Sequence, residues 1–432
     1  MKVLAPLFGY LIGSIAIGVP IAFALLFASV ATGMHMGGSS GNPQIMAAQL
    51  LRGTDSVAMM ALPFFILTGE LMNRGGLTHR IIALASATVG RVRGGLGYVA
   101  ILSALLFGSL VGSAVASTAA LGAILIPMMV KDGYNRERSA ALIASSNLVS
   151  PIMPPSVPLI IYGAAAGVSI KSLFLAGVAP ALYLTIVMFI VWYFIARSKE
   201  NIRSEIPRVG ARGLAKLAYQ AIWALLLPVI ILFGLRSGVF TATEAGVVSV
   251  VYALIIGVFV YREINVKEAF AALRSAAKVS AVVMFLAAAA QVAAYYMAIS
   301  GVPAVLTRSL GGLVDNPTLL MIVLLMFIIL LGLVLDVVPT ILIVTPIVLP
   351  LLNAAGIDLI YFGIVFTLAN VIGLNTPPVG PSLNVAAAVG NVKVGAIIRP
   401  TLPYLLAQTA LVIVMALIPE LILTPLGWLD PK

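Results

Sequence analysis

Long uninterrupted runs of hydrophobic residues, separated by short polar stretches, make up most of this 432-residue chain. About 20 consecutive apolar residues are enough for a helix to cross a lipid bilayer. Because such runs recur from one end of the chain to the other, the pattern predicts an all-α polytopic membrane protein. The predicted spans cover residues 3–36, 56–73, 139–169, 172–196, 217–235, 242–261, 279–300, 359–391 and 401–424.

Two segments are open to more than one interpretation. Residues 3–36 form either one long helix or two short helices broken near residues 18–20, and the symmetry of the chain described below favours two. Residues 262–278 form either an amphipathic helix on the membrane surface or an ordinary cytoplasmic loop.

Two further apolar runs, residues 95–130 and 317–352, differ from the others. Each run is too long for one span and barely long enough for two. Each also has small or helix-breaking residues at its middle: SLVGSAVAST in the first and GLVLDVVPT in the second. We expect each run to form a re-entrant helical hairpin, which enters the membrane halfway and returns. Irregular backbone at that depth requires a covering of protein or a cavity.

The distribution of basic residues supports this threading. If both hairpins return to the side from which they enter, one set of loops carries 19 of the 25 Lys and Arg residues. Loops rich in these residues face the cytoplasm, so the net charge of +11 reflects topology rather than a nucleic-acid partner. The first hairpin then enters from the cytoplasm and the second from the periplasm. The basic loops are residues 74–93, 131–138, 197–216, 262–278 and 393–399.

The second half of the chain also repeats the first half at one constant offset, without a gap. We infer two repeats of opposite topology, residues 1–196 and 217–432, joined by a basic cytoplasmic linker, residues 197–216. Inverted repeats with paired interrupted helices are the pattern of secondary transporters. The matched positions include Pro127 with Pro350, Asn147 with Asn370, Pro154-Pro155 with Pro377-Pro378, and Pro158 with Pro381.

Other kinds of chemistry are excluded by the sequence. The chain has no cysteine and only two histidines, far apart, which rules out disulfides and a His/Cys metal cluster. It has no P-loop and no HExxH motif. The energy for transport must therefore come from an ion gradient or from a separate ATPase subunit.

In each repeat, the hairpin is followed by a span that a Pro-Pro pair interrupts: ASSNLVSPIMPPSVP at residues 144–158 and LANVIGLNTPPVGP at residues 368–381. Such a pair removes two backbone donors and forces the helix to open. The freed carbonyl groups, with nearby Asn, Ser and Thr side chains, are hard oxygen ligands that suit Na⁺. A simple proline kink is the alternative, but the occurrence of the motif twice in register favours ion sites.

The middles of the two hairpins carry small and polar residues at corresponding positions of the two repeats. For each serine alone, helix packing is the simpler interpretation. Asp336 is the one acidic residue expected deep in the membrane, where it can be a cation ligand, a proton carrier or a structural hydrogen-bond acceptor. No Lys or Arg falls at the midplane, so an anionic substrate would be held by helix N-termini, hydroxyl groups and bound Na⁺. The corresponding triplets are Ser109, Ser113, Ser117 and Gly332, Asp336, Thr340.

Six segments together resemble the large membrane (M) subunit of TRAP (tripartite ATP-independent periplasmic) transporters, which belong to the ion transporter superfamily. The resemblance covers essentially the whole chain, and the segments follow one another in the family's order. They read ALPFFILTGELMNRGG, GSLVGSAVASTAALGAILIPMM, SPIMPPSVPLIIYG, FTATEAG, LDVVPTILIVTPIVLPLL and IGLNTPPVGPSLNV.

The resemblance implies an elevator-type architecture, in which a transport domain built from both hairpins and both broken spans slides against a fixed scaffold. It implies secondary active uptake of a small organic anion, a carboxylate or sugar acid, with Na⁺ as the coupling ion and no other cofactor. The implied partners are a periplasmic solute-binding protein and a small four-helix membrane subunit, expected here as a separate chain. The implied location is the bacterial inner membrane.

The resemblance also implies where ions and substrate bind. The first Na⁺ site is expected at Ser109, Ser113, Asn147, Ser150 and Met153. The second is expected at Gly332, Asp336, Asn370, Gly373, Thr376 and Val379. The substrate region is expected around Ser117, Pro154, Pro155, Thr340, Pro377 and Pro378.

Two other functions stay open at the level of the sequence. A stand-alone Na⁺- or H⁺-coupled anion symporter of the same superfamily would need no binding protein, and neighbouring genes for a secreted binding protein and a small membrane protein would distinguish the two. An intramembrane enzyme would use Asp336 as a catalytic acid. That chemistry normally requires a second carboxylate at matching depth, and the sequence offers none, so we expect no enzymatic activity.

Overall fold

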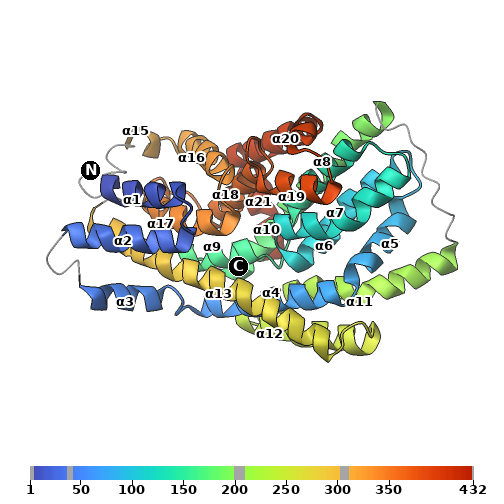
Figure 1. The fold of residues 1–432 in the computed structure, drawn as a ribbon, viewed down its shortest axis with the longest axis horizontal. Coiled ribbons are helices and arrows are strands. Elements are labelled where there is room, and N and C mark those ends of the chain that lie inside the picture. Colours follow the sequence, from blue (N-terminus) through green and yellow to red (C-terminus); the bar gives the residue numbers. More distant parts are fainter. Residues whose placement is uncertain (1–3, 37–41, 199–209, 302–310, 431–432) are drawn as a thin grey trace.

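The computed structural model describes residues 4–36, 42–198, 210–301 and 311–430, which form helices and their connections without a strand. The longer helices run roughly side by side along the long dimension of the molecule (Figure 1). This confirms the predicted all-α class. The first half contains α1 (Leu4–Ala16), α2 (Ile21–Met36), α3 (Pro43–Arg52), α4 (Val57–Arg74), α5 (Leu77–Val89), α6 (Gly95–Val111), α7 (Ala114–Lys131), α8 (Arg136–Ser146), η2 (Asn147–Val149), α9 (Val157–Ala166) and α10 (Ile170–Ser198).

The second half begins after a segment that lies outside the described residues. It contains α11 (Ala211–Arg236), α12 (Ala242–Ile255), η3 (Ile256–Val260), α13 (Val266–Ile299), α15 (Gly311–Val314), α16 (Pro317–Gly332), α17 (Val337–Ala354), α18 (Leu359–Leu374), α19 (Pro381–Gly390), α20 (Val394–Leu417) and α21 (Glu420–Leu429).

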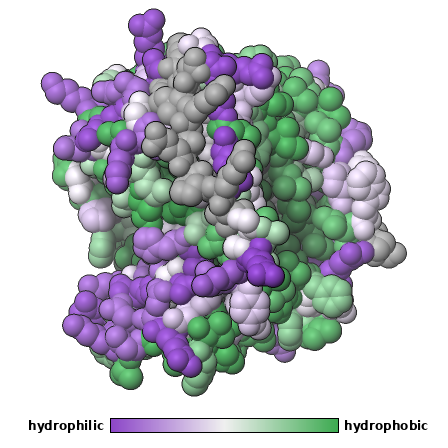
Figure 2. All heavy atoms as spheres, turned by 90° about the vertical axis from the view of Figure 1, so that its right-hand side faces the viewer, coloured by the Kyte–Doolittle hydropathy of each residue, from purple (hydrophilic) through white to green (hydrophobic). Residues whose placement is uncertain are grey.

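The surface of these helices is suited to lipid. Within the described ranges, seven helices are long and apolar enough to cross a membrane. Large apolar side chains such as Phe233, Phe259 and Leu406 are exposed on these helices, and their contact with water would be unfavourable. Hydrophilic residues instead gather on the end of the molecule that lies at the right of Figure 1, where α10 ends and α11 begins (Figure 2). The chain is therefore a multi-pass membrane protein.

Two helix–turn–helix units occupy the runs expected as hairpins. Helix α6 ends at Gly112, whose positive φ of 64° turns the chain, and Ser113 caps the start of α7 by accepting a hydrogen bond from the Ala116 N–H. Helices α16 and α17 are linked by residues 333–336, and Asp336 caps α17. Both units lie close to the expected limits, and their halfway entry into the membrane stays a prediction.

The interrupted spans open at their prolines. Between α8 and α9, residues 147–156 form only a short 3₁₀ turn and irregular backbone, and α18 and α19 are separated by residues 375–380. Both Pro154-Pro155 and Pro377-Pro378 peptide bonds are cis. Helices α6 to α10 recur in the same order as α16 to α20, at an almost constant offset in the sequence. The opposite orientation of the two copies, and the division of the chain into domains, stay predictions.

Several boundaries differ from the expectations. The span expected at residues 401–424 is two helices, because Pro419 has no N–H and Ile418 before it leaves the helical region, at φ −125° and ψ 83°. The basic stretch 74–93 contains helix α5, whose apolar face packs on α6 and α11. Residues 4–36 form two helices with a turn at Gly18, which confirms the interpretation that the symmetry of the chain favours.

Two more of the basic segments are partly helical. From Val266 onwards, the segment expected as a surface helix or loop continues without a break into the following span, as the 34-residue helix α13. The expected linker 197–216 begins with the end of α10 and finishes with the start of α11, and residues 199–209 between them lie outside the described residues.

Candidate functional site

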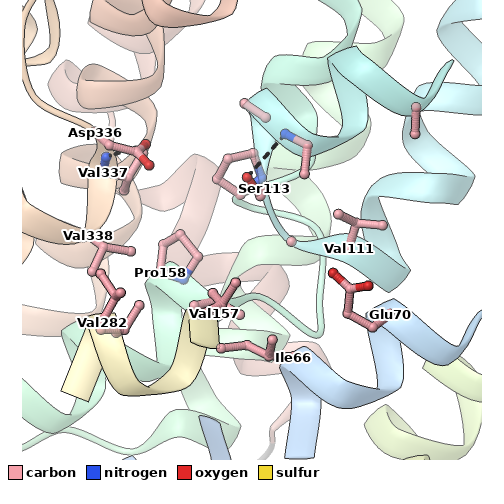
Figure 3. Close-up of a pocket in the computed structure, with 18 of the residues that line it drawn as sticks. Ile66, Glu70, Val111, Ser113, Val157, Pro158, Val282, Asp336, Val337 and Val338 are labelled. Atoms are coloured by element: carbon pink, nitrogen blue, oxygen red, sulfur yellow. Dashed lines mark hydrogen bonds between the residues drawn. The ribbon is translucent and has the colours of Figure 1, made fainter. Parts of the chain in front are cut away.

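A cavity of about 420 Å³ lies between the two helix–turn–helix units and helices α4 and α13. Helix α4 lines it with Ile66, Glu70 and Asn73, and α13 lines it with Val282 and neighbouring apolar residues. The opposite wall is made by the turn between α6 and α7, the start of α9 and the start of α17 (Figure 3). Segments from both halves of the chain thus enclose one site.

Three helices begin at this cavity. Ser113 precedes α7, Ser156 precedes α9 and Asp336 precedes α17, and residues of all three first turns line the wall. Ser113 and Asp336 lie on opposite sides and point into the space between them (Figure 3). The N-terminal end of a helix carries a partial positive charge, so three such ends favour a negatively charged group between them.

Two carboxylates, Glu70 and Asp336, are the charged groups that line the cavity. Glu70 already has partners: the Ser275 hydroxyl donates a hydrogen bond to it at 2.9 Å, and the Arg74 Nε lies 3.7 Å away. Arg74 in turn pairs with Glu268 at 2.9 Å, which links α4 to α13. Glu70 is therefore held on α4 by the Ser275 hydroxyl and by the Arg74 guanidinium, which it shares with Glu268.

Asp336 has a different environment. One carboxylate oxygen accepts a hydrogen bond from the Val337 N–H at 2.7 Å, and its backbone carbonyl accepts one from the Thr340 hydroxyl at 2.9 Å. Within the described part of the chain no Lys or Arg forms an ion pair with it. Its negative charge is thus available to a cation from the cavity.

At the first predicted Na⁺ site, the structure brings the hairpin and the broken span into direct contact. The Ser150 hydroxyl donates a hydrogen bond to the Ser117 hydroxyl at 3.0 Å, and both residues are fully buried. A Cβ on Gly108 would lie 2.9 Å from the Ser150 Cα, so the two backbones approach closely. Asn147 donates from its amide to the Ile143 carbonyl, while its buried Oδ1 has no partner among the described residues.

The other residues of this set are arranged less tightly. The Ser109 hydroxyl is buried and donates to the carbonyl of Leu106 in its own helix. Ser113 lies on the cavity wall, and Met153 is partly buried against the core. Among the described contacts, no hydrogen bond joins Ser109 or Ser113 to the broken span. The orphaned Asn147 oxygen is the observation here that fits a missing cation.

At the second predicted site, α16 and α18 meet backbone to backbone. A Cβ on Gly332 would lie 2.4 Å from the Asn370 carbonyl oxygen, and a Cβ on Gly373 would lie 2.6 Å from Gly332. Asn370 is fully buried, and neither polar atom of its amide has a hydrogen-bond partner in the described residues. A buried amide without partners is costly, and a bound cation would satisfy its oxygen.

The remaining two residues of this set lie at the opening of the helix. The Thr376 hydroxyl donates to the Ile372 carbonyl at 2.8 Å. Val379 exposes 41% of its surface, and its carbonyl accepts a hydrogen bond from the Asn384 amide. Asp336 belongs to the cavity wall.

The residues expected around the substrate occupy other positions. Ser117 and Thr340 are fully buried within their hairpins, and Pro154 and Pro155 are buried behind the start of α9. None of the six lines the large cavity. Sequence patterns did not predict the α4 wall of the cavity, although Glu70 and Asn73 lie in the ALPFFILTGELMNRGG segment that carries the family resemblance. The expected substrate residues Pro377 and Pro378 lie at the opening between α18 and α19.

Helices able to cross a membrane enclose a cavity on which three helix N-termini converge, an arrangement typical of membrane transport proteins. The chain belongs to the DctM component family of tripartite ATP-independent periplasmic transporters, whose family model matches residues 8–421. It is the large permease subunit of such a system, as the sequence predicts.

Named relatives support this assignment. The chain is 47% identical, over 97% of its length and 98% of the other chain, to a putative TRAP transporter large permease protein of Haemophilus influenzae. It is 44% identical to the 2,3-diketo-L-gulonate TRAP transporter large permease protein YiaN of Escherichia coli, over 98% of each chain. It is 34% identical to the sialic acid TRAP transporter large permease protein SiaM of Vibrio cholerae, over 96% of each chain.

A solved structure shares the fold. The YdaH transporter of Alcanivorax borkumensis superposes with a TM-score of 0.65 at 15% identity, covering 95% of this chain and 98% of that one. At this identity the likeness concerns the fold alone.

Proposed function

We propose that this permease subunit carries out Na⁺-coupled secondary uptake of a small organic anion across the bacterial inner membrane. Its substrate would be delivered by a periplasmic solute-binding protein, and a small membrane subunit would complete the complex. Relatives named for 2,3-diketo-L-gulonate, sialic acid and C4-dicarboxylates support this class of cargo, because those three substrates are carboxylates.

The observation that carries the proposal is the convergence of three helix starts on one cavity. The first turns of α7, α9 and α17 line it, and their partial positive charges can hold a carboxylate where no Lys or Arg lines the wall. The Ser113 hydroxyl can donate a hydrogen bond to the same group. The carboxylate of Glu70 and the amide of Asn73 face the cavity from α4 and can accept or donate hydrogen bonds to hydroxyl groups of the cargo.

Sodium would complete the charge balance of this site. Asp336 has no cationic partner among the described residues, and the Asn147 Oδ1 and Asn370 Oδ1 atoms are buried without hydrogen bonds. Oxygen atoms of this kind are ligands for a hard cation. A bound Na⁺ would supply positive charge beside the anion, and its gradient would supply the energy of uptake.

An elevator motion is consistent with the cavity walls. One wall belongs to α4 and α13, and the other to the hairpin turns and α9. The α13 wall is built of valines, Val279, Val282 and Val283, together with Leu286, which can slide past the hairpin turns without breaking hydrogen bonds. We propose that the second wall moves with the cargo while the first stays fixed.

Uptake into proteoliposomes tests the proposal. Radiolabelled gluconate, succinate and sialic acid would be supplied with or without an inward Na⁺ gradient, and with or without the cognate binding protein. We expect uptake of one acid only when both are present. Uptake with Na⁺ alone would instead identify a stand-alone symporter, and uptake driven equally by K⁺ would contradict sodium coupling.

A further inference from the structure

A second, smaller hollow of about 100 Å³ is lined by four of the helices that also line the large cavity: α4, α9, α13 and α17. Helix α4 contributes Met59 to this hollow and Glu70 to the large cavity. Helix α13 contributes Gln291 to this hollow and Val282 to the large cavity. On α17 it is lined by Leu342 and Pro346, which follow the residues that line the cavity. The two spaces are therefore stacked along one scaffold–hairpin cleft.

The smaller hollow lies toward the predicted periplasmic end. It is bordered by the end of α3, the start of α4 and the C-terminal part of α13. In Figure 1 helix α3 lies at the left, opposite the end where α10 stops and α11 starts. Cargo that enters from the periplasm along this cleft would meet the smaller hollow before the large cavity.

Three polar side chains in this hollow form no hydrogen bond or ion pair with other described residues. The Arg52 guanidinium has no carboxylate partner among the described residues, and the Gln291 amide forms no hydrogen bond with any of them. Ser56 precedes α4, but its hydroxyl makes no capping hydrogen bond. All three can donate hydrogen bonds, and a guanidinium matches the geometry of a carboxylate.

We propose that this hollow is an outer anion subsite, which binds the carboxylate of incoming cargo through Arg52, Gln291 and Ser56. This rests on the proposed function, because it assumes that the cargo is an organic anion. The hollow, at about 100 Å³, is much smaller than the large cavity of about 420 Å³, so we expect it to bind the carboxylate end of the cargo and the large cavity to hold the whole molecule. The subsite would raise the local concentration of anions at the entrance.

The absence of cysteine allows a direct test. In the full complex in proteoliposomes, Ser56→Cys would be the only thiol in this subunit, and its reaction with externally added sulfonate-bearing and ammonium-bearing methanethiosulfonates would be timed. We expect the ratio of the rates of the anionic and cationic reagents to be about tenfold higher than for a free thiol, because the Arg52 guanidinium lines the same hollow and attracts one reagent while it repels the other. Adding Arg52→Gln should remove that preference.

Arg236→Gln is the matched control, because Arg236, like Arg52, is an exposed arginine at the end of a helix, and it lies outside the hollow. The double variant Ser56→Cys/Arg236→Gln should keep the preference. Gluconate should slow labelling of Ser56→Cys while glucose, its uncharged counterpart, should not, and Arg52→Gln should abolish the protection.

Two results would contradict the subsite. In the first, the preference for the anionic reagent would be the same with and without Arg52→Gln. In the second, the preference would depend on Arg52, but neither gluconate nor succinate would slow the labelling. Labelling does not depend on transport. A complex that fails to take up any acid would therefore contradict the proposed function while leaving this measurement interpretable.

Discussion

Asp336 occupies a position where a helix cap needs a short polar side chain, but capping does not require that the side chain carry a charge. It caps α17, as its counterpart Ser113 caps α7, and both face the cavity. A serine is sufficient as a helix cap, so the carboxylate of Asp336 adds negative charge that capping does not explain. We therefore propose that this charge binds a cation.

The first prediction concerns that charge. Asp336→Asn keeps an amide that can cap α17 and removes the negative charge, so we expect the Na⁺ concentration for half-maximal uptake to rise about tenfold or more. Uptake measured against Na⁺ concentration gives this value. Asp358→Asn is the control, since Asp358 caps α18 through Tyr361 away from the cavity. An equal effect of both variants would contradict the assignment.

A second residue-scale prediction concerns pH. Lys171 lies 2.8 Å from Asp430 and, with the Ser172 hydroxyl, lowers the pKa of that carboxyl below its usual 3.8. A carboxyl whose folded pKa is lowered stabilises the protein above its unfolded pKa, and this stabilisation is lost as the pH falls through the folded pKa. The melting temperature of Asp430→Asn should therefore fall below that of the wild type at pH 7, and the difference should shrink toward pH 3. A difference independent of pH would contradict the ion pair.

At the scale of the elements, the contact between α16 and α18 depends on two glycines. Neither Gly332 nor Gly373 has room for a Cβ, because each lies against the backbone of the other helix. Such close approach is typical of helix pairs in membranes, where small residues bring backbones together. The contact also holds Asn370, the buried amide without partners among the described residues, next to the end of α16.

The third prediction follows from this contact. Gly332→Ala should destabilise the folded protein by about 1–3 kcal/mol, because a Cβ would overlap the Asn370 carbonyl. Gly395→Ala is the matched control: Gly395 lies in helix α20 with nothing within 4 Å of the added Cβ, so it should be neutral or stabilising by about 0.4–1 kcal/mol. Thermal melts in detergent compare the two, and equal melting temperatures would show that α16 and α18 have room to separate.

The limits of the helices were predictable where residues that form turns or break helices mark them in the sequence. Glycine, serine and aspartate at the middles of two overlong apolar runs predicted the turns before Ser113 and after Gly332, and the proline pairs predicted the openings after α8 and α18. Helix α5 was not predicted, because the basic residues on both sides of its 13 residues make the whole stretch resemble a loop. The break at Ile418 was not predicted, because the residues on both sides of Pro419 are apolar except for Glu420.

The site was predictable only in part, for a reason that belongs to packing. Motifs local to each hairpin identified Ser113 and Asp336, which both face the cavity. The wall contributed by Glu70 of α4 and Val282 of α13 depends on which helices from the two halves of the chain pack together, and a span pattern contains no such information. The same holds for Ser117, whose hydrogen bond to Ser150 turns it away from the cavity.

At the scale of the whole molecule, the fourth prediction tests the opposite orientation of the two repeats. Asn135 and Asp358 are repeat counterparts, exposed caps at the starts of α8 and α18. A single cysteine at each position should react with an impermeant thiol reagent from opposite sides: Asp358→Cys from the periplasm and Asn135→Cys only from the cytoplasm. Each loses a helix cap worth about 1 kcal/mol, which both proteins should tolerate. Labelling of both from one side would contradict the inverted repeat.

The measurement that tests the account most directly is accumulation of the transported acid against its own gradient. Proteoliposomes that contain the complete complex would be preloaded with the acid, and binding protein charged with the same acid would be added outside together with Na⁺ or K⁺ gradients of equal size. The account predicts net accumulation with an inward Na⁺ gradient, none with K⁺, and little with Asp336→Asn at the same Na⁺ concentration. Equal accumulation with Na⁺ and K⁺ would contradict it.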